Sequence, residues 1–317
     1  MKSILRFSTV LALAALVGCS QNQQPVAPET NDAAQTLAAE ELSFEKSLPK
    51  ITVPDDYATI QAAVDAATGA TKINVKSGTY TETVNVNKPG LVIGATGTVT
   101  LNGGFNLSAD ADNVTIRNFK IFPPQDVYGI NAFGVTGGKA EDNIVTGGSA
   151  FEAGIVYLSS TGCTIKGNTV SGCNFGIVLS TSSGNTIDDN SVNNCFAGIV
   201  LQEDSDNNKI SGNTASSSGS TGLQLVSGSD RNSVKDNVCN GNGQYGIFLL
   251  DVNNNTIGSG NTANSNGDNG IYLGTTANDN TVKKNTATGN TGCDLVNDTF
   301  NSGNVFTKNS AGCTSGF

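Results

Sequence analysis

Short segments in the second half of the chain place Ile or Leu at every second position. Four of them read GIVLS (176–180), GIVLQ (198–202), GLQLV (222–226) and GIFLL (246–250). Alternation over about five residues predicts β-strands rather than helices. Each segment opens on a glycine, and the same opening recurs at regular intervals along the chain.

The interval is close to 24 residues, and three separate rows of residues keep it. In the first row, an Asn is followed two positions later by a small apolar residue. Its members are Asn118, Asn143, Asn168, Asn190, Asn213, Asn237, Asn261, Asn285 and Asn309. The second row is Gly129, Gly154, Gly176, Gly198, Gly222, Gly246 and Gly270, and the third is Ile165, Ile187, Ile210, Val234, Ile257 and Val282. The chain therefore repeats from about residue 113 to its end.

This period predicts a solenoid of strands. Helical repeats need about 33 residues or more, whereas a coil of about 24 holds three short strands with turns between them. Coils stacked at about 4.8 Å form three parallel sheets around one core. We expect Ile177, Ile199 and Leu223 to stack inside, next to Leu179 and Leu201. The Asn rows should form ladders at the turns.

The segment ITVPDDYATIQAAVDAATGATKINVKSGTYTETVNVNKPGLVIGA (51–95) precedes the repeats. Together with the rows N-x-I, G-N-T-V and G-I-x-L, it resembles the pectin lyase-like superfamily, in particular its carbohydrate-binding and sugar-hydrolase (CASH) type, which includes NosD-like periplasmic proteins. The resemblance implies an all-β, single-stranded right-handed parallel β-helix of about ten coils over residues 51–317. It also implies an N-terminal capping helix at about 59–67, where Ile60, Ala63, Val64 and Ala67 share one face.

The N-terminus reads as a secretory signal. MKSILRFSTVLALAALVGC (1–19) has a basic start, an apolar stretch and small residues before a cysteine. The ending LVGC resembles the bacterial lipobox, which implies lipidation of Cys19 and a lipid-anchored protein of the cell envelope, at the outer membrane if the cell has one. An ordinary signal with an incidental cysteine is the alternative. Residues 20–50 are polar, with Pro and Ala, and predict a tether.

Charge and composition exclude some partners. The chain has a net charge of −10, and losing Lys2 and Arg6 with the signal would make it −12. Such a chain has no basic patch for nucleic acid. Copper sites need imidazole or soft sulfur ligands, but the sequence has no His and its one Met is the initiator.

Six cysteines follow Cys19. Cys173 and Cys195 each lie five residues after a row Asn, so they should stack on neighbouring coils as a disulfide or as two free thiols. Cys239 and Cys293 are predicted to be small core residues, and Cys313 could close the last coil. No spacing resembles a zinc site.

Several acidic positions could suggest catalysis. Asp188 and Asp189 fall in one turn, and other coils have Gly, Asp or Lys at the position of Asp189. GTYTE (78–82), with Gln125 and Asp126, resembles pectin methylesterases, but Ala150 stands where that family has its nucleophilic Asp. No residue stands out as catalytic.

A lyase that cleaves uronate polymers needs a base and usually Ca²⁺. The nearest candidates are Arg231 as base, with Asp206 and Asp230, which share one coil position. Glu203 and Asp204 could join these two acids in holding Ca²⁺. Solvated turn acids without a cation are the alternative.

One row of residues should face outward from the strands yet is largely apolar. It contains Val200, Gln224, Phe248 and Tyr272, with Leu250 two positions beyond Phe248. Exposed apolar stripes mark binding surfaces, and aromatic rings stack on sugars. We therefore predict a surface-anchored module that binds extended polysaccharide without catalysis. The alternatives for the protein are a polysaccharide-degrading enzyme and a structural envelope protein or adhesin. The alternatives for the stripe are ordinary β-propensity on an exposed sheet and coverage by the tether.

Overall fold

A computed structural model describes residues 43, 45–147, 153–298 and 303–316. The expected signal peptide, Cys19 and most of the expected tether lie outside these residues. The chain divides into two units, Met1–Lys46 and Ser47–Phe317, and the repeats belong to the second. Among the described residues, no helix is long and apolar enough to cross a membrane.

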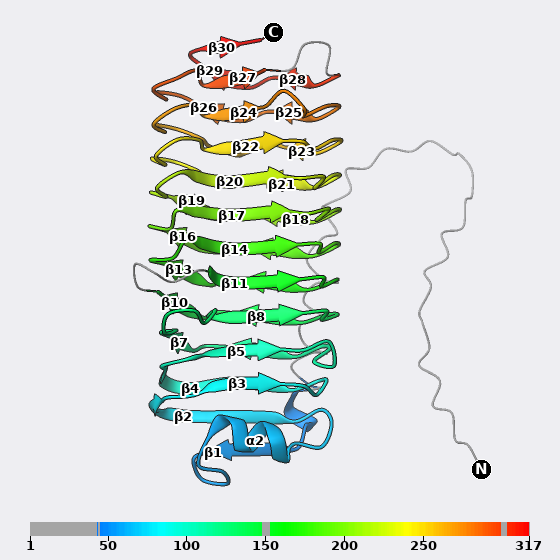
Figure 1. Ribbon diagram of the computed structural model, residues 1–317, viewed down its shortest axis with the longest axis vertical. Coiled ribbons are helices and arrows are strands. Elements are labelled where there is room, and N and C mark those ends of the chain that lie inside the picture. Colours follow the sequence, from blue (N-terminus) through cyan, green and yellow to red (C-terminus); the bar gives the residue numbers. More distant parts are fainter. Residues whose placement is uncertain (1–42, 44, 148–152, 299–302, 317) are drawn as a thin grey trace, which may run out of the picture. The chain divides into compact units, whose positions relative to one another are not determined.

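The second unit is a stack of coils whose strands pair in parallel from coil to coil (Figure 1). We call its most regular side sheet B, which has 11 strands in the described part of the chain and so counts about 11 coils, where about ten were expected. Its strands are β3 (Thr83–Val86), β5 (Gly104–Leu107), β8 (Ile130–Phe133), β11 (Ala153–Leu158), β14 (Phe175–Ser180), β17 (Ala197–Gln202), β20 (Thr221–Val226), β22 (Ile247–Leu250), β24 (Ile271–Leu273), β27 (Leu295–Asn297) and β30 (Thr314–Ser315).

Two further parallel sheets complete each coil, which confirms the predicted three. Sheet A contains β1 (Lys50–Val53), β2 (Lys72–Tyr80), β4 (Val92–Leu101), β6 (Thr115–Arg117), β9 (Lys139–Glu141), β12 (Thr164–Lys166), β15 (Thr186–Asp188), β18 (Lys209–Ser211), β21 (Ser233–Lys235), β23 (Thr256–Ile257), β25 (Thr281–Lys283) and β28 (Val305–Thr307). Sheet C contains β7 (Lys120–Ile121), β10 (Ile144–Thr146), β13 (Thr169–Ser171), β16 (Ser191–Asn193), β19 (Thr214–Ser216), β26 (Thr286–Ala287) and β29 (Ser310–Ala311). The long strand β4 pairs with both β6 and β7, and so joins sheets A and C.

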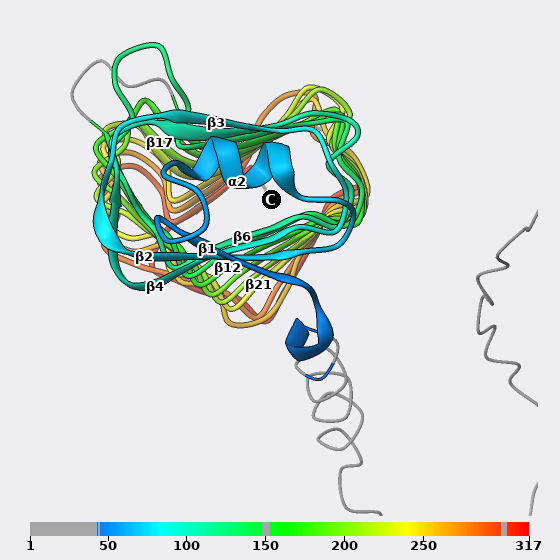
Figure 2. The same cartoon turned by 90° about the horizontal axis from the view of Figure 1, so that it is seen from below.

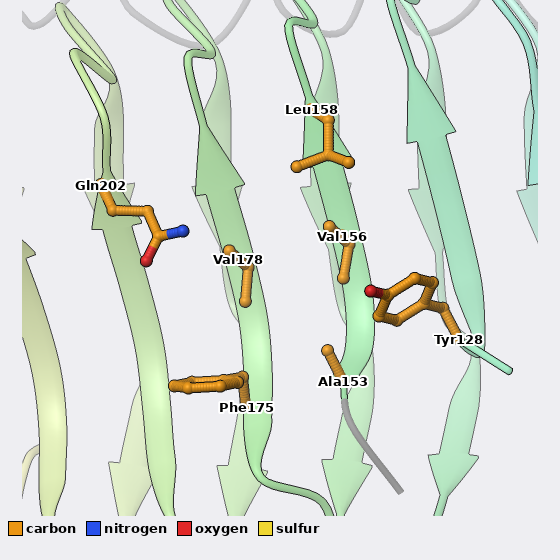
Figure 3. A pocket seen from close by; sticks show the side chains of 7 residues that line it. All are labelled: Tyr128, Ala153, Val156, Leu158, Phe175, Val178 and Gln202. Atoms are coloured by element: carbon orange, nitrogen blue, oxygen red, sulfur yellow. The ribbon is translucent and has the colours of Figure 1, made fainter. Parts of the chain in front are cut away.

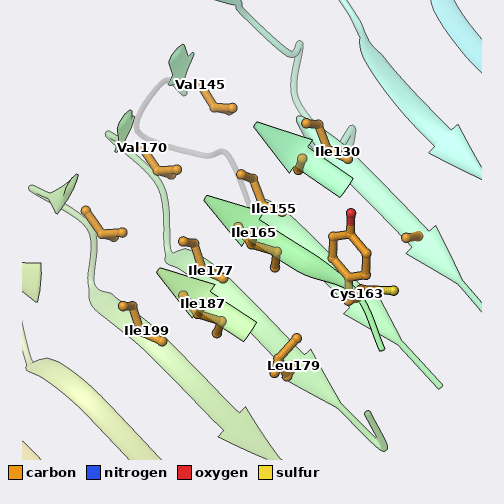
Figure 4. Close-up of a cluster of buried hydrophobic side chains, with 14 of the residues drawn as sticks. Ile130, Val145, Ile155, Cys163, Ile165, Val170, Ile177, Leu179, Ile187 and Ile199 are labelled. Carbon is orange, nitrogen blue, oxygen red and sulfur yellow. The ribbon is translucent and has the colours of Figure 1, made fainter. Parts of the chain in front are cut away.

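The core consists of aliphatic rows, as predicted. Ile177 pairs with Ile199, which pairs with Leu223, and all three side chains are fully buried. Leu179 and Leu201 form the neighbouring row in the same register. In Figure 4, Ile177, Leu179 and Ile199 of sheet B lie among buried side chains that include Ile165 and Ile187 of sheet A and Val170 of sheet C.

Asparagines form hydrogen-bonded ladders along the coils. The predicted ladder runs from Asn143 to Asn309, with each side-chain oxygen accepting the backbone or side-chain N–H of the preceding coil. Asn118 does not extend it, because the register places Phe119 opposite Asn143. A second ladder was not predicted. It contains Asn185, Asn208, Asn232, Asn255, Asn280 and Asn304.

The turn before the first ladder explains the adjacent carboxylates at 188 and 189. Asp189 has φ +53°, and the same turn position is left-handed in each coil from Asn118 to Lys308. Gly and Asp tolerate this conformation better than most residues do, so the position varies among small, polar and flexible side chains. Asp188 ends β15 and accepts hydrogen bonds from Lys166 and Ser211. Although partial burial opposes ionisation, these partners outweigh it and lower the pKa of Asp188. The pair is a structural turn.

Helix α2 (Ile60–Ala66) covers the N-terminal end of the core, as predicted (Figure 2). Thr59 caps it by accepting the N–H of Ala62, and Ile60, Ala63 and Val64 are buried. The helix therefore shields the first apolar edge of the stack.

A disulfide between Cys293 and Cys313 fastens the last coils. This bond corrects the prediction that Cys293 is a core residue. The register places Leu295, not Cys293, opposite Ile271, so Leu295 fills the core position and Cys293 lies at the preceding turn.

Candidate functional site

The predicted outward row runs along sheet B in strict register. Asn131 pairs with Val156, and the row continues through Val178, Val200, Gln224, Phe248 and Tyr272. It crosses seven strands, from β8 to β24. Two other rows flank it on the same face, one containing Phe175 and Ala197 and the other containing Leu158 and Gln202. The outer face of sheet B is thus a band three residues wide.

The part of this band that lies nearer the N-terminus is more deeply buried than strand alternation predicts. Val156, Val178 and Val200 point away from the core, yet Val200 is only 1% exposed. Ala153 and Ala197 complete this second apolar cluster, and partly buried Tyr128 and Leu158 pack on it. Val200 therefore forms the floor of the face and is not an exposed contact residue.

A shallow cavity of about 150 Å³ opens over Val156 and Val178. Figure 3 shows the residues that line it: Tyr128, Ala153, Val156, Leu158, Phe175, Val178 and Gln202. Phe175 is 36% exposed, so a ring and an amide are available at the rim of an apolar depression. Concave apolar sites with a few polar groups are typical of ligand sites.

Three aromatic rings gather farther along the same face. The ring centroids of Phe248 and Tyr272 lie 5.6 Å apart with nearly parallel planes. Tyr245 lies 4.9 Å from the ring of Phe248 and 5.2 Å from that of Tyr272. All three side chains are half-buried, and Leu250 beside them is exposed. Tyr245 was missed in the sequence, although it precedes Ile247 by the two positions that separate Phe175 from Ile177.

Both tyrosines of this aromatic cluster (Tyr245, Phe248 and Tyr272) have acidic neighbours. Tyr272 donates its hydroxyl to Asp298 at 2.8 Å. Burial, and then Asp298, raises the pKa of Tyr272 to about 12. Burial, and then Asp268, raises the pKa of Tyr245. Both phenols are therefore neutral at physiological pH.

The predicted calcium and lyase residues lie at the turns beyond the ends of the sheet B strands. Arg231 forms an ion pair with Asp206. Asp206 also accepts the backbone N–H of Asp230 at 2.7 Å, and Asp230 accepts that of Asn253 at 2.6 Å. Glu203 accepts the hydroxyl of Ser180. These contacts give both aspartates a structural role within the coils.

The same acids do not converge. Among the residues that the structure describes, no group of three or more His, Cys, Asp or Glu side chains is placed to hold a metal ion. Asp204, the fourth candidate ligand, has a left-handed backbone and lies next to Gly228 of the following coil. Calcium binding at Glu203, Asp204, Asp206 and Asp230 stays a prediction, as does a role for Arg231 as a base.

Two family models match the chain in overlapping parts. The model for the right-handed beta helix region matches residues 83–238, and that for the periplasmic copper-binding protein NosD matches residues 202–314. The periplasmic alginate epimerase AlgG has a similar structure, with 16% identity and a TM-score of 0.56. That alignment covers 92% of this chain and 99% of the other. The fold is a right-handed parallel β-helix of the pectin lyase-like type.

Other solved structures share this β-helix at low identity. The A-module of the mannuronan C-5 epimerase AlgE4 from Azotobacter vinelandii is 16% identical, with a TM-score of 0.55, over 83% of this chain and 92% of that one. ORF18 of Geobacillus virus E2 is 15% identical, with a TM-score of 0.64, over 90% of this chain and 65% of that one. No curated protein sequence matches the chain. At this identity the likeness establishes the fold.

The esterase-like motif has a structural use in the β-helix. Glu82 accepts the backbone N–H groups of Ile60 and Gln61 at 2.9 and 2.8 Å, and so caps the first turn of α2. Asp126 has a left-handed backbone in an exposed turn before β8. Gln125 is exposed in the same turn, and Ala150 lies outside the described residues.

Cys173 and Cys195 lie on neighbouring coils of the β-helix, as their spacing predicts. Their sulfur atoms are 2.7 Å apart, and both side chains are buried. The hydrogen bond between them, together with burial, raises the pKa of Cys173. The same bond lowers that of Cys195. The structure leaves both thiols free, so a disulfide between them stays a prediction.

Proposed function

We propose that the protein binds an extended polysaccharide along the outer face of sheet B without cleaving it. The observation that carries this proposal is the continuous row from Asn131 to Tyr272, which ends in the aromatic cluster. Apolar rings can lie against the C–H faces of sugars, while amides such as those of Gln202 and Gln224 bond to hydroxyls. Because identical positions recur at every coil, the face suits a polymer better than a small molecule.

The fold agrees with this proposal. The solved relatives include alginate and mannuronan epimerases, whose names describe proteins that act on polysaccharides. The lyase alternative has less support, because Arg231 is paired with Asp206 and the acids beside it accept backbone N–H groups. A copper function, named for the NosD family, also has less support, since the sequence contains no His and its single Met is the initiator. A structural protein or adhesin would use the same face toward a protein.

We further propose an envelope location with a lipid on Cys19. The sequence of residues 1–19 supports this, and the NosD family is described as periplasmic. In a bacterial expression host, the mature wild type should incorporate a labelled fatty acid. Cys19→Ser should abolish the label. Labelling of Cys19→Ser, or an unlabelled wild type, would contradict the anchor.

The experiment that tests binding removes the rings one at a time. Phe248→Ala and Tyr272→Ala should each weaken binding to the best polysaccharide found in a glycan screen by about tenfold, the loss expected for one good ring contact. The matched control is Phe122→Ala, which removes an exposed ring that follows strand β7 of sheet C. Calorimetry measures the affinities of the wild type and of the three variants. Unchanged affinity in both test variants, or a screen without any binding, would refute the proposal.

A further inference from the structure

Charge is unevenly distributed among the three sheets. In the described part of the chain, no strand of sheet B contains a Lys, Arg, Asp or Glu. Every charged residue within a described strand lies in sheet A or C; Lys139, Lys209 and Lys235 of sheet A are examples. The proposed binding face is therefore uncharged, although strands of the same coils carry cations on other sides.

The ends of this face are bordered by acids. Asp298 accepts the hydroxyl of Tyr272, and Asp268 contributes to the raised pKa of Tyr245. Glu203 follows β17 directly and accepts the hydroxyl of Ser180, which ends β14. A ligand seated on the aromatic cluster would thus lie close to fixed negative charges.

Within the described residues, two basic residues lie in the turns between a sheet B strand and the next strand of the chain. Both are bound to other groups of the protein. Arg231 is paired with Asp206. Lys88 donates to the backbone oxygens of Val64, Asp65 and Ala67 at the end of α2. Neither is placed to neutralise a carboxylate on the face. A polymer with a carboxylate on each sugar would meet repulsion from the acids and find no charge partner.

We infer that the outer face of sheet B selects a neutral polysaccharide and rejects a uronate polymer. This inference rests on the proposed function and makes it narrower. The polar groups of the face include the amides of Gln202 and Gln224 and the two phenols of the cluster. These groups exchange hydrogen bonds with sugar hydroxyls without needing charge on the ligand. The relatives named as alginate and mannuronan epimerases act on uronate polymers, so this face would set the present protein apart from them.

The test compares polymers that differ only in charge. Polygalacturonate and alginate are each paired with their own carboxyl-reduced derivative, and galactomannan and hydroxyethyl cellulose extend the neutral set. The full mature chain is titrated by calorimetry at one ionic strength. We expect a preference of about tenfold or more for the reduced member of a pair, or binding to a neutral polymer with none to the uronates.

The second part of the test adds a positive charge to the binding face. Gln224→Lys places a cation in the middle of the face and should narrow the preference for the neutral polymer. Ser233→Lys adds the same charge on sheet A and should leave the preference unchanged. Equal or tighter wild-type binding to a uronate polymer would overturn the inference and leave the proposed function standing. If no polymer binds, the proposed function fails, and the inference fails with it.

Discussion

The side-chain oxygen of Asn213 accepts both the backbone N–H and the side-chain N–H of Asn190, each at 2.9 Å. The side-chain N–H groups of Asn213 donate to the carbonyl of Ile187 and to the side-chain oxygen of Asn237. All of these groups are buried. One asparagine therefore satisfies polar groups of two other coils. Its loss would leave these buried hydrogen-bonding groups without a partner, because water cannot reach them.

Asn213→Ala should destabilise the β-helix strongly. Leaving the N–H groups of Asn190 unpaired should cost about 3 kcal/mol, which lowers the thermal midpoint by about 5 °C for a unit of this size. Circular dichroism measures the midpoint. Gln244→Ala removes an exposed amide near the same coils and should change it by about 2 °C or less. Equal midpoints in the two variants would contradict a stabilising role for the ladder.

Glu82→Ala should loosen the N-terminal cap. The variant deprives the backbone N–H groups of Ile60 and Gln61 of a charged acceptor, so we expect a loss of about 2 kcal/mol. Glu82→Gln keeps one acceptor oxygen and should lose roughly half as much. Hydrogen exchange at the amides of residues 60 and 61 should accelerate in the same order. An unchanged exchange rate in Glu82→Ala would be inconsistent with capping.

Cys173 and Cys195 should form a disulfide in an oxidising compartment. Sulfur atoms 2.7 Å apart need only a small shift to reach a bond of about 2.05 Å. After denaturation without reductant, both cysteines should resist alkylation, whereas the solitary Cys239 should react fully. Peptide mass spectrometry reads both results from one sample. Complete alkylation of Cys173 and Cys195 would establish them as free thiols.

The same disulfide would stabilise the fold. Closing a loop of about 22 residues should contribute about 3 kcal/mol, so Cys173→Ser should lose that amount only under oxidising conditions. The control measures wild type and variant in reductant, which also opens Cys293–Cys313 in both, so their stabilities should then be equal. A variant as stable as the oxidised wild type would speak against the bond.

Tyr272 should make stability depend on alkaline pH. Its folded pKa of about 12 exceeds the value of about 10 expected when unfolded. Its contribution is therefore fully present below about pH 10 and is lost as the pH rises to about 12. The difference in thermal midpoint between wild type and Tyr272→Phe should change over that window. Asp298→Asn, which removes the anionic acceptor, should lower the pKa of Tyr272. Ultraviolet titration of the phenols showing no such change would disprove the coupling.

The fold was predictable because a solenoid converts sequence spacing into contact. Residues one period apart become neighbours, so counting alone placed Ile177 on Ile199 and Asn190 on Asn213. Counting also identified Asp189 as a turn residue, since other coils place Gly there. The predictions for Asn118 and Cys293 were wrong. They matched each residue to a row by its type and spacing, whereas the strand register places Phe119 and Leu295 at those row positions.

The sequence by itself determined the stack of parallel strands and the row that faces outward, because each depends only on a period and on side-chain alternation. The capping helix followed from the resemblance to the pectin lyase-like superfamily and from the apolar face that Ile60, Ala63, Val64 and Ala67 share. The tertiary structure decided which parts of that row a ligand can touch. Val200 is covered because residues from three rows and adjacent turns close over it, while Tyr245 turns toward Phe248 and Tyr272 from a different row. These contacts depend on the size and direction of neighbouring side chains, and the spacing of residues along the sequence does not specify either.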